Sequence, residues 1–88
     1  MFEEIINIDK LPTLDLHREY PEIAIIRIND FIKDNVKLKN KYVVIVHGKG
    51  KGIIKKTTHD TLKNNNLVLE YKLYIFNEGA TIIKLNTL

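Results

Sequence analysis

LDLH at residues 14–17 and HGKGKG at residues 47–52 are the two stretches that decide the fold and the chemistry of this chain. The first places Asp15 and His17 two residues apart, at the end of an apolar run. In an extended strand side chains alternate between faces, so both side chains share one face. The second puts His47 at the head of a loop rich in glycine and lysine. Histidine moves protons near neutral pH, and amides at a helix start bind phosphate, so both stretches indicate chemistry on, or binding of, a phosphodiester backbone.

The rest of the chain alternates between strand-like and helix-like patterns. Pro21 suits the first position of a helix, and apolar residues then recur at helical spacing. The β-branched run at residues 42–46 is typical of a strand buried on both faces. Asn77-Glu78-Gly79 is a turn signal between two strands that pair as a hairpin. The expected elements are strand 13–17, helix 21–36, strand 42–46, helix 53–64, strand 67–76 and strand 80–85.

This β-α-β-α-β-β order predicts an α/β fold, a two-layer α+β sandwich. Both β-α-β crossovers should be right-handed, which places the two helices on one face of a mixed four-stranded sheet. Asp15, His17 and His47 then lie near the carboxyl ends of the first two strands, where open α/β sheets bind ligands. We expect residues 12–88 to form a single domain. Residues 1–11 form an N-terminal arm, within which residues 3–11 are an alternative edge strand.

Length and composition narrow the class of protein. The chain has 88 residues, 44% of them hydrophobic, which is ordinary for one small globular domain. It has no cysteine, which excludes disulfides and thiolate metal sites, and its three scattered histidines do not suit zinc. No apolar run approaches the ~18 residues of a membrane helix. Glu3 and Glu4 stand where a signal peptide has basic residues, so we expect a cytoplasmic protein without a membrane partner.

Charge is distributed unevenly along the chain. The net charge is −4 over residues 1–36, +7 over residues 37–63 and zero over residues 64–88. A middle third this basic is typical of a protein that binds a polyanion, although a solvated lysine-rich face has the same composition. The glycine loop lies inside this basic segment, which favours phosphate as the partner.

Both stretches resemble signatures of one family. LDLH at residues 14–17 is similar to the LDLHG signature of the Smr (small MutS-related) domain, and residues 47–50 are similar to its HGKG signature. Residues 77–85 resemble the glycine-rich turn and strand that close the domain, so the resemblance covers about residues 12–86. The resemblance is to a standalone member of the family. It implies a fold like the C-terminal domain of translation initiation factor three, and DNA nicking, RNA cleavage or binding alone.

The chain departs from the family pattern in two places. Arg18 stands where the family has glycine, which replaces a residue suited to positive φ with a cation able to bind phosphate through two hydrogen bonds. Tyr20-Pro21 replaces the Ser or Thr that commonly caps the first helix, a change that concerns helix entry more than function.

Three residues are candidates for catalysis. Asp15 is a metal ligand, a general base or the group that orients His17, and its structural alternative is an acid that caps a loop. His17 is a general base or acid; otherwise it is a hydrogen-bonded residue at a strand end. His47 transfers protons or binds a phosphate directly; its structural alternative is a brace that holds the loop through hydrogen bonds. His59, with no motif around it, is expected at the surface.

The glycine loop and the cations near it are candidates for phosphate binding. Because the glycines alternate, we expect Gly50 either to lie close to a ligand or to adopt a positive φ. The spacing fits neither a Rossmann loop nor a Walker loop. Lys55 and Lys56 have a solvated helix face as their alternative. The full predicted nucleic-acid-binding set is Arg18, Gly48, Lys49, Gly50, Lys51, Gly52, Lys55 and Lys56.

Two functions of different classes follow. The first is an endonuclease of the Smr type, in which Asp15 orients His17 or a divalent metal and the glycine loop holds the phosphate. The second is a binding module for DNA, RNA or a ribosome that lacks catalysis, and Arg18 is the feature that favours it. A weaker third is an interaction domain for an acidic protein. The sequence leaves the substrate, the cofactor (Mg²⁺ or Mn²⁺ being the candidates) and the oligomeric state undetermined.

We predict that binding is electrostatic and depends steeply on salt. Replacing Lys49 and Lys51 together by alanine should weaken binding across sequences and flatten the salt dependence by about two units on duplex DNA, because each lost phosphate contact removes about 0.9 from the slope. Fluorescence anisotropy over a salt series measures both effects. An unchanged affinity in the double variant would remove this loop from the binding site.

Overall fold

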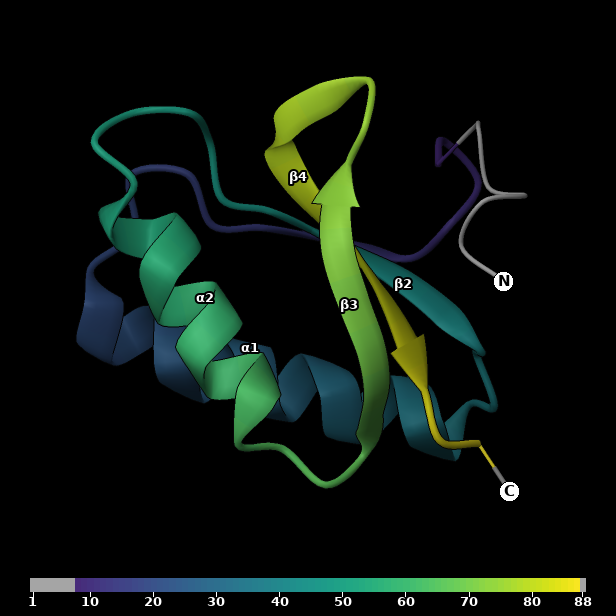
Figure 1. Cartoon of the computed structure of the whole chain (residues 1–88). Helices are drawn as coiled ribbons and strands as arrows, with labels where there is room; N and C mark the ends of the chain where they lie inside the picture. The colour runs from purple at the N-terminus through teal and green to yellow at the C-terminus, as the bar shows by residue number, and fades with distance from the viewer. Residues whose placement is uncertain (1–7, 88) are drawn as a thin grey trace.

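The computed structural model describes residues 8–87, which form four strands and two helices (Figure 1). The predicted order β-α-β-α-β-β is confirmed. In chain order the elements are β1 (Thr13–Asp15), α1 (Pro21–Lys37), β2 (Tyr42–Val46), α2 (Ile53–Lys63), β3 (Val68–Tyr74) and β4 (Asn77–Leu85).

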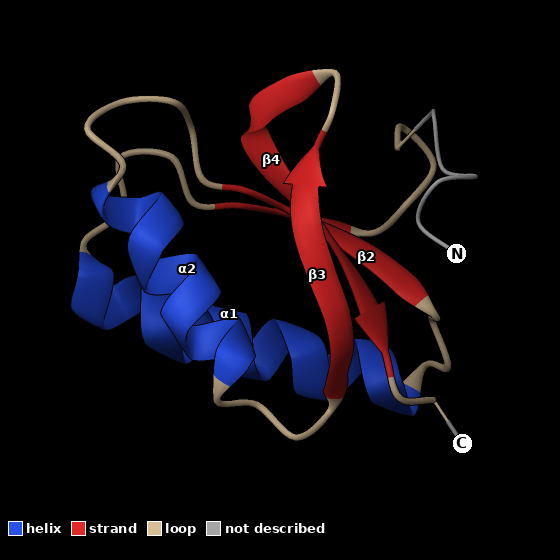
Figure 2. Cartoon of the chain, viewed as in Figure 1, coloured by secondary structure: helices blue, strands red, loops and turns tan. Residues whose placement is uncertain are grey.

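The strands form one mixed sheet in the order β1-β2-β4-β3. β1 pairs with β2 in parallel, whereas β4 pairs in antiparallel fashion with both β2 and β3. The last strand of the chain therefore lies inside the sheet, between two strands that precede it. Both helices cover the same face, as predicted (Figures 1 and 2).

The core has one cluster on each face of the sheet. On the helix side Ile28 of α1 and Leu62 of α2 pack against Val43 and Ile45 of β2, all four almost fully buried. Burying one such side chain contributes about 1.5–3 kcal/mol. On the other side Val44 joins residues of β3 and β4, so β2 is buried on both faces as its β-branched run predicted. Within residues 8–87 there is no helix long and apolar enough to cross a membrane.

The second cluster also receives residues that precede β1. Ile8 and Leu11 pack against it, on the sheet face that the helices leave open. The expected arm or edge strand at the N-terminus begins before residue 8 and lies largely outside the described residues.

The turn predicted at Asn77-Glu78-Gly79 is wrong. The turn between β3 and β4 is Ile75–Phe76, and β4 already begins at Asn77. Tyr74 pairs with Asn77 while Leu73 pairs with Thr81, so β4 carries extra residues opposite this step and bulges. Gly79 lies in that bulge, where it contacts the glycine loop instead of turning the chain.

Three backbone segments meet at Gly48. Its φ is +84°, and a Cβ added there would lie 3.3 Å from Cβ of His17. On the opposite side a Cβ added to Gly79 would lie 3.3 Å from the carbonyl carbon of Gly48. The N–H groups of His47 and Gly48 both donate to the Gly79 carbonyl, at 2.9 and 3.0 Å. The end of β1, the loop after β2 and the bulge of β4 are thus held in direct contact.

The other two loop glycines, Gly50 and Gly52, make no such close backbone contact. Gly52 has a φ of +82° and precedes the first residue of α2, where glycine adopts the left-handed conformation at no steric cost. The positive φ offered as one alternative for Gly50 is wrong, because Gly48 and Gly52 are the loop glycines with positive φ. A Cβ added to Gly50 would meet nothing within 4 Å, so this position is open.

We predict opposite results for alanine at two loop glycines. Gly48→Ala should lower the free energy of unfolding by about 2 kcal/mol, because it combines a positive φ with contact to His17. Gly50→Ala should change it by less than about 0.5 kcal/mol, because its surroundings are open. Urea denaturation followed by circular dichroism measures both. Equal destabilisation by the two variants would contradict this account of the loop.

Candidate functional site

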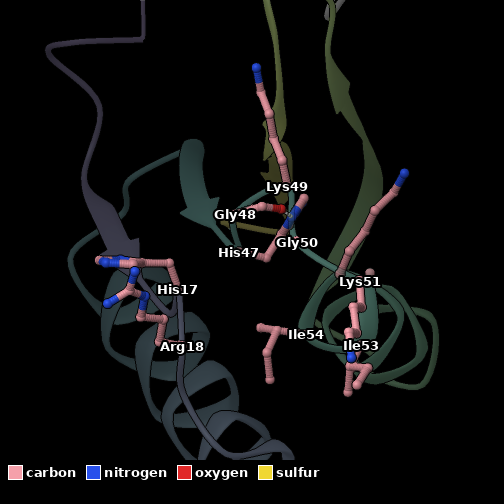
Figure 3. A pocket seen from close by; sticks show the side chains of 11 residues that line it. His17, Arg18, His47, Gly48, Lys49, Gly50, Lys51, Ile53 and Ile54 are labelled. Carbon is pink, nitrogen blue, oxygen red and sulfur yellow. Dashed lines mark hydrogen bonds between the residues drawn. The ribbon is translucent and has the colours of Figure 1, made fainter.

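A cleft of about 490 Å³ opens where β1 and β2 end and α2 begins (Figure 3). It is lined by His17, Arg18 and every residue from His47 to Lys55. The two stretches predicted to form the site are therefore brought together. Asp15 does not line the cleft but contacts His17, which does.

Asp15 and His17 form a hydrogen-bonded pair at the edge of this cleft. Nδ1 of His17 lies 2.6 Å from Oδ1 of Asp15, and the backbone N–H of His17 donates to the same oxygen at 3.1 Å. These hydrogen bonds to His17 hold the pKa of the Asp15 carboxyl below its ordinary value of 3.8. Both side chains are more than half exposed, at 57% and 59%, so a ligand can reach the pair from solvent.

Arg27 of α1 secures the loop that carries this pair. Its Nη1 donates to Oε2 of Glu19 at 3.0 Å and lies 3.5 Å from the Asp15 carbonyl oxygen. The positive charge also contributes, as a smaller effect, to the lowered pKa of Asp15. Sequence reasoning missed Arg27, because its partners lie 8 and 12 positions earlier and outside any motif.

His47 is buried, with 4% of its surface exposed, and both of its ring nitrogens have partners. Nδ1 lies 3.0 Å from the Gly48 carbonyl oxygen, and Nε2 lies 2.8 Å from Oγ1 of Thr81. Burial lowers the pKa of His47 below its ordinary value of 6.5, which favours the neutral ring. This environment favours a loop brace over proton transfer to a substrate.

His59 lies against the other side of the same hydroxyl. Its Nε2 is 2.8 Å from Oγ1 of Thr81, and its ring stands 5.8 Å from the ring of His47 at an interplanar angle of 90°. The expectation that His59 is a surface residue is wrong, because its ring is half-buried between His47 and Tyr71. Burial, followed by the field of His47, lowers the pKa of His59.

The predicted cations divide into two groups. Lys49, Lys51 and Lys55 line the cleft, and Figure 3 shows Lys49 and Lys51 extending outward from the glycine loop. Lys56 does not line it. Its Nζ lies 2.8 Å from Oδ2 of Asp60 one turn further along α2, and this exposed ion pair raises the pKa of Lys56.

Arg18 adopts a positive-φ backbone conformation, which glycine adopts more readily than other residues. Its φ is +63°, in the left-handed region, and its side chain lines the cleft beside His17 (Figure 3). Arg18 therefore adds a cation to the cleft at the cost of a strained φ.

The donor groups here suit a divalent ion only in part. Among residues 8–87 no three or more acidic or histidine side chains converge as metal ligands would. The Asp15 carboxylate is the group beside the cleft that suits Mg²⁺ or Mn²⁺, since such ions are often held by one or two carboxylates together with substrate phosphates.

The fold and site define a small α+β domain whose cationic glycine loop lies beside an exposed Asp-His pair. The Smr domain matches residues 14–86 of the chain. The chain therefore belongs to the Smr domain family.

Relatives and solved structures agree with this assignment. The chain is 36% identical over 70 residues to Endonuclease MutS2 of Halothermothrix orenii and 35% identical over 68 residues to that of Geobacillus thermodenitrificans. These matches cover 80% and 77% of this chain but only 9% of each relative. The chain thus spans about a tenth of the length of these relatives.

Two solved structures share the fold. The Smr domain of Thermus thermophilus MutS2 superposes with a TM-score of 0.83 and 18% identity, over 86% of this chain and 99% of that one. YdaL, a stand-alone small MutS-related protein from Escherichia coli, superposes with a TM-score of 0.81 and 23% identity, over 89% of this chain and 69% of that one.

We predict that Arg18→Gly stabilises the protein while weakening its binding to nucleic acid. Glycine avoids the steric cost of positive φ, so the free energy of unfolding should rise by about 0.5–1 kcal/mol. The loss of a cation from the cleft should lower affinity. Urea denaturation and anisotropy with a labelled oligonucleotide measure the two effects.

Lys39→Gly is the matched control. Lys39 has a φ of +62° just after α1 and does not line the cleft. It should gain similar stability without a comparable loss of binding. If both variants bind equally well, Arg18 is not part of the interface.

Proposed function

We propose that this chain is a nucleic-acid endonuclease that holds a phosphodiester in the cleft and cleaves it with Asp15 and His17. The observation that carries the proposal is the 2.6 Å contact between Nδ1 of His17 and Oδ1 of Asp15, beside a cleft lined by lysines. The name Endonuclease MutS2 on the relatives supports the same reaction class.

The pair has the arrangement of a general base and its orienting group. The Asp15 carboxylate accepts the hydrogen bond from Nδ1–H of His17, which leaves Nε2 of the neutral ring without a proton. Nε2 can then take the proton from an attacking hydroxyl, either a water or the 2′-hydroxyl of RNA. The hydroxyl oxygen attacks phosphorus and the bond to the leaving oxygen breaks. The leaving oxygen takes up a proton from solvent, and the His17 imidazolium returns its proton to solvent.

The cleft supplies charge where the reaction needs it. Arg18, Lys49 and Lys51 bring cations to a phosphate that gains negative charge as it is attacked. Mg²⁺ or Mn²⁺ beside Asp15 would act as a further Lewis acid when bound. The proton transfers are assigned to His17, with Asp15 fixing its orientation.

A binding module without catalysis is the alternative. The departure of Arg18 from the family glycine favours it, because this cation can pair with a phosphate next to His17. The φ of +63° at Arg18 weighs against it, since the backbone of the loop keeps a conformation that glycine would adopt. The same cleft and lysines serve both functions, so cleavage itself must decide between them.

Two variants should separate binding from cleavage. Asp15→Asn and His17→Ala should each lower the cleavage rate about 10²- to 10⁴-fold, the usual contribution of a general base, and leave binding nearly intact. Asp15→Asn should bind slightly more tightly, because a negative charge near phosphate is removed. Rates are measured on supercoiled DNA and on labelled structured RNA, with and without Mg²⁺ or Mn²⁺.

The control is Asp60→Asn, which removes an acid that pairs with Lys56 outside the cleft. It should retain the wild-type rate. If the wild-type protein cleaves neither DNA nor RNA under any of these conditions but binds them, the binding module is the correct function.

A further inference from the structure

Three polar side chains form a chain of hydrogen bonds beneath the glycine loop. His59 of α2 contacts Oγ1 of Thr81 in β4, and the same oxygen contacts Nε2 of His47, each at 2.8 Å. The other ring nitrogen of His47 lies 3.0 Å from the Gly48 carbonyl oxygen. Thr81 is fully buried, so these partners are inside the protein rather than water.

The direction of each hydrogen bond in this series follows from the Gly48 carbonyl at one end of it. A carbonyl oxygen only accepts, so Nδ1 of His47 carries the proton that reaches Gly48. In the neutral ring Nε2 is then an acceptor, and the hydroxyl of Thr81 must donate to it. That hydroxyl has a single proton, so Oγ1 of Thr81 accepts from Nε2–H of His59.

The hydrogen bond from Nδ1 of His47 to the Gly48 carbonyl fixes the orientation of a peptide that lines the cleft. In a trans peptide the carbonyl and the following N–H point in opposite directions. Because the Gly48 carbonyl faces the buried ring of His47, the N–H of Lys49 points away from that ring, and both residues of this peptide line the cleft. An amide in that orientation is a donor for a phosphate oxygen.

We propose that Thr81 and His59 are positioning residues: they supply the donor at Nε2 that complements the Nδ1–H tautomer of His47, hold that ring in place, and through it orient the Gly48–Lys49 peptide for phosphate binding. The part that concerns phosphate rests on the proposed function. The part that concerns the tautomer and the peptide does not depend on it. Neither residue touches the substrate in this arrangement.

The tautomers are measured by long-range ¹H–¹⁵N NMR spectra of the full chain at neutral pH. The wild type should show His47 protonated at Nδ1 and His59 protonated at Nε2. Thr81→Val, which is nearly isosteric, leaves Nε2 of His47 without its donor and should shift the ring-nitrogen resonances of His47 and the amide resonance of Lys49. Thr81→Ser keeps a hydroxyl and should restore both signals.

Thr58→Val is the matched control for the loss of a buried hydroxyl. Thr58 is also fully buried and lies next to His59 in sequence, but its Oγ1 has no hydrogen-bond partner among the described residues. This variant should leave the ring-nitrogen resonances of His47 and the amide resonance of Lys49 unchanged. An effect as large as that of Thr81→Val would show a general packing response and overturn the proposal.

Binding is measured with a fluorescein-labelled DNA duplex and a labelled RNA hairpin. Thr81→Val should weaken binding about tenfold, the equivalent of one hydrogen bond to a charged group, while Thr81→Ser and Thr58→Val bind as the wild type does. A wild-type ring protonated at Nε2, or a Thr81→Val spectrum unchanged at His47 and Lys49, overturns the positioning role. Changed spectra with unchanged affinity overturn its link to phosphate. If the wild-type protein binds neither probe, the proposed function is wrong. The NMR spectra test the positioning role independently of that result.

Discussion

The close contact of three backbones at Gly48 is the constraint on which the rest of the site depends. His17 lies against one side of this glycine and Gly79 against the other, each close enough that an added Cβ would be within 3.3 Å of a neighbouring atom. Hydrogen bonds from His47 and Gly48 to the Gly79 carbonyl lock the contact. This contact places the Asp-His pair, at and just beyond the end of β1, beside the cationic loop that follows β2. The Asp-His pair and the glycine loop are therefore parts of one packed unit.

The polar residues around this contact differ in their exposure to solvent. Asp15 and His17 are more than half exposed and share a short hydrogen bond, so the pair is open to a ligand. His47 and Thr81 are buried and use their polar atoms on the protein itself. His17 and His47 each belong to one of the two sequence motifs, yet His17 is exposed and His47 is buried. The ring of His17 is open to solvent, whereas the ring of His47 contacts the Gly48 carbonyl and Thr81 inside the protein.

The local features of the fold could be predicted from the sequence, and the contacts between distant segments could not. The alternation over residues 13–17 predicted that Asp15 and His17 lie together, and they do pair, although β1 ends at Asp15 and His17 lies beyond the strand. The β-branched run of β2 indicated burial on both faces. The turn was misplaced because Asn77 and Gly79 have turn-like composition, yet Gly79 is required by its contact with Gly48. Gly50 resembles its neighbours in sequence, but it faces open space. His59 was missed because its partner Thr81 lies 22 positions away in another element.

The position of β4 in the sheet has a consequence for the order in which the molecule forms during synthesis. A ribosome releases β2 and β3 before β4, yet these two strands pair with β4 and not with each other. The middle of the sheet must therefore remain open until β4 emerges and inserts. Because Gly79 and Thr81 belong to β4, the anchors of the glycine loop arrive at the same moment. A nascent chain therefore has no assembled cleft before that step.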